Sequence, residues 1–291
     1  AAAIRSREKV IRSLPAAQKH LMPNGQIPDP AAIWHRPDME KTLQRLQREG
    51  WQDFYKGDLG RQIADHVKSL GGILTRDDMK RFQPRLTEPY KTSFRNAQIH
   101  SGILANGGLT VAQLLNMWEM LPSQPVTDAL YWHQFAEAGK LAWRDRLQYL
   151  GDGVDPKKFL SKDYAAKRIE PLRNNPNYID RQPAPFAGTS PGTVNITTAD
   201  ADGNMVAVTL SHGGSFGSCV TVPNTGITLG HGMCRFDPRP GRANSVGPNK
   251  RPLNNVCPTI IRLPDRDIAL GLRGGRYELE LEVLLPRSSA A

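Results

Sequence analysis

The stretch PGTVNITTADADGN, residues 191–204, is followed directly by MVAVTLS, residues 205–211. Both halves have the composition of strands, and the Asp-Gly pair between them is typical of a tight turn, so they predict a two-stranded antiparallel hairpin. The first strand begins with threonine after glycine. If the peptide bond between Gly192 and Thr193 breaks, the threonine hydroxyl becomes a nucleophile and its freed amine serves as the base. Because Gly-Thr is a common pair, Thr193 could equally be an ordinary strand residue.

The length and composition are those of a globular protein. The chain has 291 residues, of which 39% are hydrophobic and 23% charged, enough to form a sizeable core. No apolar run approaches the ~18 residues of a membrane-spanning helix, so no membrane partner is expected.

The formal net charge of +10 raises the possibility of nucleic-acid binding. However, the basic residues are scattered among acids, as in RLQRE at 45–49 and RDDMKR at 76–81. We therefore expect no nucleic-acid partner, and interpret the positive charge as favouring acidic small molecules through long-range attraction.

Three cysteines, Cys219, Cys234 and Cys257, occur at spacings that fit no zinc motif. They are expected to be free or buried thiols, which favours a reducing, cytoplasmic compartment. The chain begins without methionine or a signal peptide and both ends look cut, so a periplasmic or secreted location stays open.

A helical half precedes a strand-rich half. The irregular, proline-containing segment 174–192 is expected to link them. Apolar periodicity predicts helices at 38–49, 60–70, 109–121 and 127–150, and a short one capped by Thr75. The aromatic residues of 127–150, Trp132 among them, are interpreted as core. Strands are expected at 98–103, 193–199, 205–211, 226–229, 259–263 and 267–272.

Several short motifs flank the Gly-Thr pair in a fixed order. Those before it are FYKG at 54–57, GGILTRDD at 71–78, PY at 89–90 and GG at 107–108. Those after it are SHGG at 211–214, GMCRF at 232–236, GPNKRPLNN at 247–255 and GLRGGR at 271–276. This order resembles the γ-glutamyltransferase family of N-terminal-nucleophile hydrolases over nearly the whole chain.

The resemblance implies an α+β fold, the four-layer αββα sandwich of that superfamily. It implies self-cleavage between Gly192 and Thr193, which gives a large-subunit portion, 1–192, and a small-subunit portion, 193–291. These would remain together as a heterodimer. The family's large subunit normally begins well before residue 1 and its small subunit ends well after residue 291, so the chain resembles a central portion.

The resemblance also implies the roles of individual residues. Thr193 corresponds to the nucleophile, and Ser211 to a threonine whose hydroxyl positions it. Gly274 and Gly275 correspond to the glycine pair whose backbone N–H groups form the oxyanion hole. The substrate would be a small-molecule amide. No metal or organic cofactor is expected, and the turn at 200–204 lacks the glycine and glutamate spacing of a calcium loop.

The sequence departs from the family at the substrate-binding positions. Arg235 replaces an acid that pairs with the α-amino group of a glutamyl substrate, and Gly213 replaces an asparagine. Asn254 and Asn255 replace two serines that grip the α-carboxylate. These changes favour a glutaryl or other dicarboxylic mono-amide over a γ-glutamyl amide. The segment 240–248 is shorter than the lid of many relatives, which predicts an open pocket. The alternative is a non-catalytic or unprocessed relative that acts as a binding or structural protein.

Overall fold

The computed structural model describes residues 1–182 and 193–271. The chain divides into two compact units, each assembled from two separate stretches of sequence. The first comprises residues 1–86 and 214–231, and the second residues 87–213 and 232–291. The predicted subunit boundary at Thr193 falls inside the second unit. The two compact units therefore do not coincide with the two predicted subunits, and they carry no information on cleavage at Thr193.

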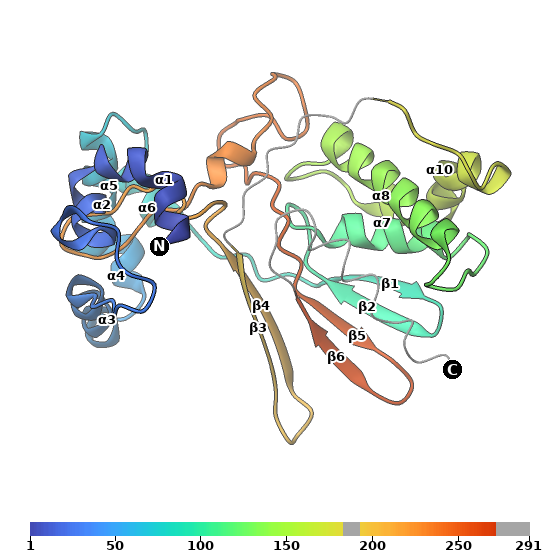
Figure 1. Cartoon of the computed structure of the whole chain (residues 1–291), viewed down its shortest axis with the longest axis horizontal. Coiled ribbons are helices and arrows are strands. Elements are labelled where there is room, and N and C mark those ends of the chain that lie inside the picture. The colour runs from blue at the N-terminus through green and yellow to red at the C-terminus, as the bar shows by residue number, and fades with distance from the viewer. Residues whose placement is uncertain (183–192, 272–291) are drawn as a thin grey trace. The chain divides into compact units, whose positions relative to one another are not determined.

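The first unit is helical (Figure 1). Its helices are α1 (Ala2–Arg12), α2 (Pro15–Leu21), η1 (Pro23–Gly25), α3 (Pro37–Glu49), α4 (Gln52–Lys56), α5 (Asp58–Ser69) and α6 (Arg76–Arg81). The predicted helices at 38–49 and 60–70 are confirmed as α3 and α5. Thr75 caps α6 as expected: its hydroxyl accepts the Asp78 N–H at 3.1 Å, and the Asp78 carboxylate accepts the Thr75 N–H at 3.0 Å.

The strand predicted at 226–229 is wrong. Within residues 214–231 the pairing reduces to one isolated bridge, between Thr221 and Thr228. Asn224 and Gly226 between them have φ values of 59° and 68°, in the left-handed region. Two such residues turn the chain back on itself and prevent a continuous strand.

The second unit contains a four-stranded antiparallel sheet in the order β1-β2-β5-β6 (Figure 1). Its strands are β1 (Tyr90–Phe94), β2 (Ala97–Ser101), β5 (Thr259–Arg262) and β6 (Asp267–Leu270). Three of these were expected, and β1 was not. The pairing of β2 with β5 joins segments that are far apart in the sequence.

Helices form a layer on this sheet. They are α7 (Gly108–Trp118), α8 (Ala129–Tyr149), α9 (Lys157–Leu160) and α10 (Lys162–Asn174). α7 packs on β1 and β2, and α8 and α10 pack on α7. The buried aromatic residues Tyr131 and Phe135 of α8 contribute to the core between them. Trp132 does not: it is 45% exposed, and its indole N–H donates to the Val126 carbonyl, so its assignment to the core is wrong.

The predicted hairpin is confirmed as β3 (Thr193–Ala199) and β4 (Met205–Ser211). Gly203 takes a φ of 82° in the turn, and the Asp200 carboxylate accepts the N–H groups of Asp202 and Asn204 at 3.0 and 2.9 Å. These bonds give the acidic turn a structural role. Both strands contact β6, which places the hairpin beside the four-stranded sheet.

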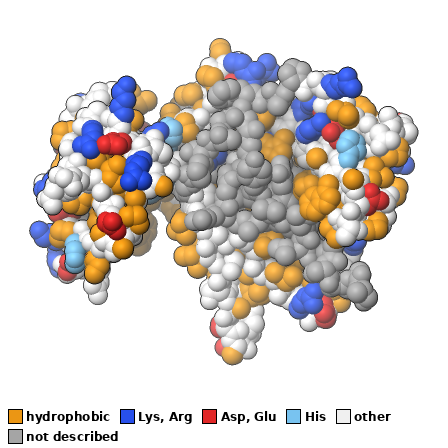
Figure 2. All heavy atoms as spheres, viewed as in Figure 1, with side chains coloured by type: hydrophobic (Ala, Val, Ile, Leu, Met, Phe, Trp, Pro, Cys, Tyr) orange, Lys and Arg blue, Asp and Glu red, His pale blue; other side chains and the backbone are white. Residues whose placement is uncertain are grey.

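The surface agrees with the scattered charge seen in the sequence. Figure 2 shows Lys and Arg side chains distributed among acidic and apolar ones over the visible face.

None of the three cysteines, all within the described ranges, forms a disulfide. In these ranges no helix is both long and apolar enough to cross a membrane, and no cluster of three or more His, Cys, Asp or Glu side chains could hold a metal ion.

Candidate active site

The open end of the β3–β4 hairpin brings Thr193 and Ser211 together. They are directly opposed in the register. The Thr193 hydroxyl donates to the Ser211 Oγ at 3.1 Å, and Thr193 is only 6% exposed. Because the turn at 200–204 fixes the register, it also fixes this pair. The arrangement holds a buried hydroxyl at the first residue of a strand, next to a second hydroxyl.

Gly213 completes the local arrangement. Its backbone N–H donates to the Ser211 Oγ at 3.1 Å, so that oxygen accepts from two groups at once. Gly213 has a φ of 83°, a conformation that glycine adopts without strain. The turn that leaves β4 therefore favours glycine at this position.

The predicted oxyanion glycines, Gly274 and Gly275, lie outside the described residues, as does Gly192. The chain leading to the glycine pair is described as far as Gly271, which lies against β3. A Cβ on Gly271 would be 2.0 Å from Oδ1 of Asn195. Asn195 and Thr193 point to the same face of β3 because they are two residues apart. Gly271, the residue that follows β6, thus lies on the side of the hairpin that carries Thr193.

We expect Gly271→Ala to reduce stability by about 1–3 kcal/mol, because its Cβ would overlap the Asn195 amide, which also accepts the Thr209 hydroxyl at 2.7 Å. Thermal unfolding of single and double variants measures this. Asn195→Ala in the same chain should recover most of the loss. Gly139→Ala in α8, where nothing lies within 4 Å of a new Cβ, is the control and should not lower stability. Equal losses for Gly271→Ala and Gly139→Ala would contradict the close approach.

Arg235 ends the short helix η2 (Gly232–Arg235) and is half-buried. Its Nε is buried, and within residues 1–182 and 193–271 no hydrogen-bond acceptor reaches it. No carboxylate in the same ranges forms an ion pair with its guanidinium. A cation in this state can receive an acidic group from a ligand.

The predicted pair Asn254 and Asn255 lies in the segment before β5. The backbone of Asn254 is fixed at both ends: its N–H donates to the Ala105 carbonyl at 2.7 Å, and its carbonyl accepts from Arg146 at 2.6 Å. Asn255 is 8% exposed. The two amides are thus carried on a rigid backbone, which suits residues that hold a ligand.

Arg146 was not predicted from the sequence. It lies on α8, is 1% exposed, and also donates to the Asn106 carbonyl and the Thr110 hydroxyl, at 3.2 and 3.3 Å. Burial above all, with the nearby positive charge of Arg235 as a smaller cause, lowers the pKa of Arg146 to about 10. The two guanidinium groups are therefore close enough to interact. An arginine on the buried face of a predicted helix, at apolar spacing, is the signal that could have identified it.

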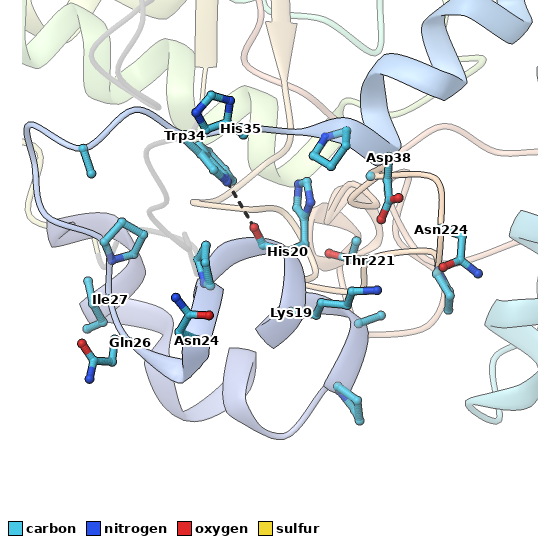
Figure 3. Close-up of a pocket in the computed structure, with 18 of the residues that line it drawn as sticks. Lys19, His20, Asn24, Gln26, Ile27, Trp34, His35, Asp38, Thr221 and Asn224 are labelled. Atoms are coloured by element: carbon cyan, nitrogen blue, oxygen red, sulfur yellow. Dashed lines mark hydrogen bonds between the residues drawn. The ribbon is translucent and has the colours of Figure 1, made fainter.

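A cavity of about 870 Å³ in the first unit is separate from these residues. Figure 3 shows Lys19, His20 and Trp34 around it, with the Trp34 indole N–H donating to the His20 carbonyl at 3.2 Å. Burial and the neighbouring Arg36 lower the pKa of His20. None of the described site residues lines this cavity, so it is not the candidate active site.

Comparison with known proteins places the chain in a family. The γ-glutamyltranspeptidase family matches residues 1–283. The chain is 32% identical to the acylase ACY 1 proenzyme of Pseudomonas sp. (strain V22) over 274 residues, which cover 89% of this chain and 48% of the relative. It is also 32% identical to the glutathione hydrolase proenzyme of Escherichia coli (strain K12) over 248 residues, 77% of this chain and 42% of the relative.

Among solved structures, the cephalosporin acylase from Bacillus halodurans superposes with a TM-score of 0.84 at 26% identity. The match covers 97% of this chain and 52% of that one. The chain spans about half the length of the curated relatives it matches. These likenesses confirm the expected α+β fold of N-terminal-nucleophile hydrolases. By sequence and by fold, the chain belongs to the γ-glutamyltranspeptidase family.

Proposed function

We propose that the chain is part of a self-processing amidohydrolase or acyltransferase that uses Thr193 as its nucleophile. The observation that carries this proposal is the contact, at 3.1 Å, between the hydroxyl of buried Thr193 at the first residue of β3 and that of half-buried Ser211. Family membership supports it, and the two curated relatives compared above are both named as proenzymes.

The first reaction is cleavage of the chain itself. The Thr193 Oγ attacks the carbonyl carbon of Gly192, the peptide C–N bond breaks, and an ester forms in its place. The released nitrogen takes up the proton that the hydroxyl loses. Water then hydrolyses the ester, which leaves a carboxylate on Gly192 and a free amine on Thr193. The portions 1–192 and 193–291 then form the two subunits of a heterodimer.

Substrate turnover repeats this chemistry on an external amide. The free amine of Thr193 accepts the hydroxyl proton while Oγ attacks the substrate carbonyl. Ser211 keeps the nucleophile in place, and the N–H groups of Gly274 and Gly275 stabilise the oxyanion. The leaving amine takes a proton and departs, which leaves the acyl group as an ester on Thr193. Water or an acceptor amine then removes that group.

The substrate that the site favours is a dicarboxylic mono-amide of the glutaryl type. Arg235 presents a half-buried guanidinium where the family's acid would meet an α-ammonium group. With Arg146 nearby, the region is positive and attracts a carboxylate. Asn254 and Asn255 can donate hydrogen bonds to the same carboxylate. A γ-glutamyl donor stays the second candidate, because the Escherichia coli relative is a glutathione hydrolase.

We expect the wild-type protein to prefer a glutaryl anilide over a γ-glutamyl anilide by about ten- to a hundredfold in kcat/KM, because a cation opposes the α-ammonium group. Arg235→Asp should reverse this order. The measurement is kcat/KM for both donors in both proteins. A wild-type preference for the glutamyl donor that Arg235→Asp leaves unchanged would remove the argument from Arg235 and support a conventional γ-glutamyltransferase.

A further inference from the structure

The side-chain amide of Asn244 joins the two segments that carry the proposed substrate-binding residues. Its Nδ2 donates to the carbonyl of Arg235 at 2.7 Å, and its Oδ1 accepts the N–H of Leu253 at 3.0 Å. Asn244 is 8% exposed, so neither bond is readily replaced by water. One planar group thus connects the end of η2 to the residue directly before Asn254.

The loop that carries Asn244 is stabilised by its own contacts. The Asn244 carbonyl accepts the Asp237 N–H at 2.9 Å, and Asp237 forms an ion pair with Arg239. The Ser245 hydroxyl accepts the Arg242 N–H at 2.8 Å and donates to the Arg239 carbonyl. This compact loop contains the segment 240–248 that is predicted to be short. It therefore presents the Asn244 amide from a fixed backbone.

The other side of the connection is equally fixed. Leu253 is buried, and the next residue, Asn254, is held by Ala105 and Arg146 through its backbone. Because this segment is anchored to the helical layer, the Asn244 amide sets the position of Arg235 relative to it. Loss of the hydrogen bonds made by the Asn244 side chain would release Arg235 rather than the pair Asn254–Asn255.

We infer that Asn244 is a positioning residue that determines which acyl chain length the enzyme accepts. Arg235 and the pair Asn254–Asn255 are the groups proposed to hold the distal carboxylate of the acyl chain. In that arrangement, the position of the bound carboxylate relative to Thr193 fixes how many methylene groups fit between them. Asn244 influences this position because its amide joins the backbone of Arg235 to that of Leu253. The inference rests on the proposed function for the identity of the substrate.

The role requires an amide. Asn244 supplies one donor and one acceptor, in opposite directions, to two backbone groups. In Asn244→Asp the acceptor for Leu253 is retained, but a carboxylate oxygen faces the Arg235 carbonyl. Two acceptors repel each other, so η2 should move away from the segment of Leu253 with almost no change in side-chain volume.

Asn116 provides a matched control in the same unit. It lies on α7, is fully buried, and also bridges two partners: its Nδ2 donates to the Leu160 carbonyl at 3.0 Å, and its Oδ1 accepts the Thr92 hydroxyl at 2.8 Å. Neither partner belongs to the proposed site. Asn116→Asp therefore reproduces the loss of a buried bridging amide without disturbing Arg235.

The experiment compares succinyl, glutaryl and adipyl anilides as donors for the wild type, Asn244→Asp and Asn116→Asp. We expect Asn244→Asp to lower kcat/KM for the preferred donor by about tenfold, mainly through KM, and to bring the three donors within about threefold of one another. Asn116→Asp should keep the wild-type order. Hydrogen exchange measured by mass spectrometry should be faster in Asn244→Asp over 232–237 and unchanged over the anchored segment 253–257, and it should be unchanged over both segments in Asn116→Asp. If Asn244→Asp does not fold, Asn244→Ser replaces it under the same criteria.

Two results would overturn the inference. One is faster exchange over 232–237 with an unchanged order of donors, which would make Asn244 a structural residue only. The other is unchanged exchange, which would show that the amide does not hold the segments. If the wild type turns over none of the three donors, the proposed function is wrong for dicarboxylic amides, and the exchange measurement still decides whether the amide holds Arg235 in place.

Discussion

Thr193→Ala is expected to give a protein that stays uncut and has lost amidase activity by about 10⁴-fold or more, because both reactions use the same oxygen. The Thr193 hydroxyl lies at the start of β3, is buried, and is 3.1 Å from the Ser211 Oγ. Among the described residues, no other hydroxyl takes this position on β3. Electrophoresis under denaturing conditions reports the cleavage, and release of an anilide chromophore reports the turnover.

Thr193→Ser is the control for this experiment, since it keeps the nucleophilic oxygen and removes only a methyl group. It should still cut itself and retain measurable activity. If Thr193→Ala were cut and active like the wild type, Thr193 would be an ordinary strand residue and the mechanism would fail. If the wild type itself were uncut and inactive, the chain would belong to a non-catalytic relative.

Ser211→Ala is expected to lower kcat by about ten- to a thousandfold, because a hydrogen bond that positions a group near developing charge has effects of this order. The Ser211 Oγ accepts from both Thr193 and Gly213, so its removal frees the nucleophile and the turn after β4 together. Ser211→Thr restores the hydroxyl and should restore most of the rate.

Thr209→Val separates catalysis from hairpin stability. The Thr209 hydroxyl also donates a hydrogen bond between the two strands of the hairpin, to Oδ1 of Asn195 at 2.7 Å, but neither residue of this pair touches the nucleophile. Ser211→Ala and Thr209→Val should lose similar amounts of thermal stability, and only Ser211→Ala should have a lower kcat. Equal kcat values for the two variants would show that Ser211 does not position Thr193.

The local parts of the fold were predictable from the sequence. The hairpin was predicted because its turn, its β-branched residues and its length all lie within 19 consecutive residues, 193–211. The cap at Thr75 and the helices α3 and α5 follow from short-range patterns in the same way. β1 was missed because its five residues, YKTSF, are mostly polar, and α10 because it contains Pro171. The strand expected at 226–229 failed because Asn224 and Gly226 adopt left-handed conformations.

The site was predictable only where a motif carried it. The resemblance gave Thr193 and Ser211, and the register of the hairpin then brought them together. Arg146 and Asn244 belong to no such motif, because their importance depends on the partners that the folded backbone brings to them. Arg146 reaches the Asn254 carbonyl across more than a hundred residues, and no local pattern specifies such a contact.

The most direct test of the central claim is the intact mass and N-terminal sequence of the purified full-length wild-type protein. The account predicts two chains, the second of which begins Thr-Val-Asn-Ile at Thr193. After incubation with an acyl donor and rapid acid quenching, that second chain should carry the added mass of one acyl group. A single uncut chain that nevertheless hydrolyses amides, or an acyl group found on any other residue, would contradict it.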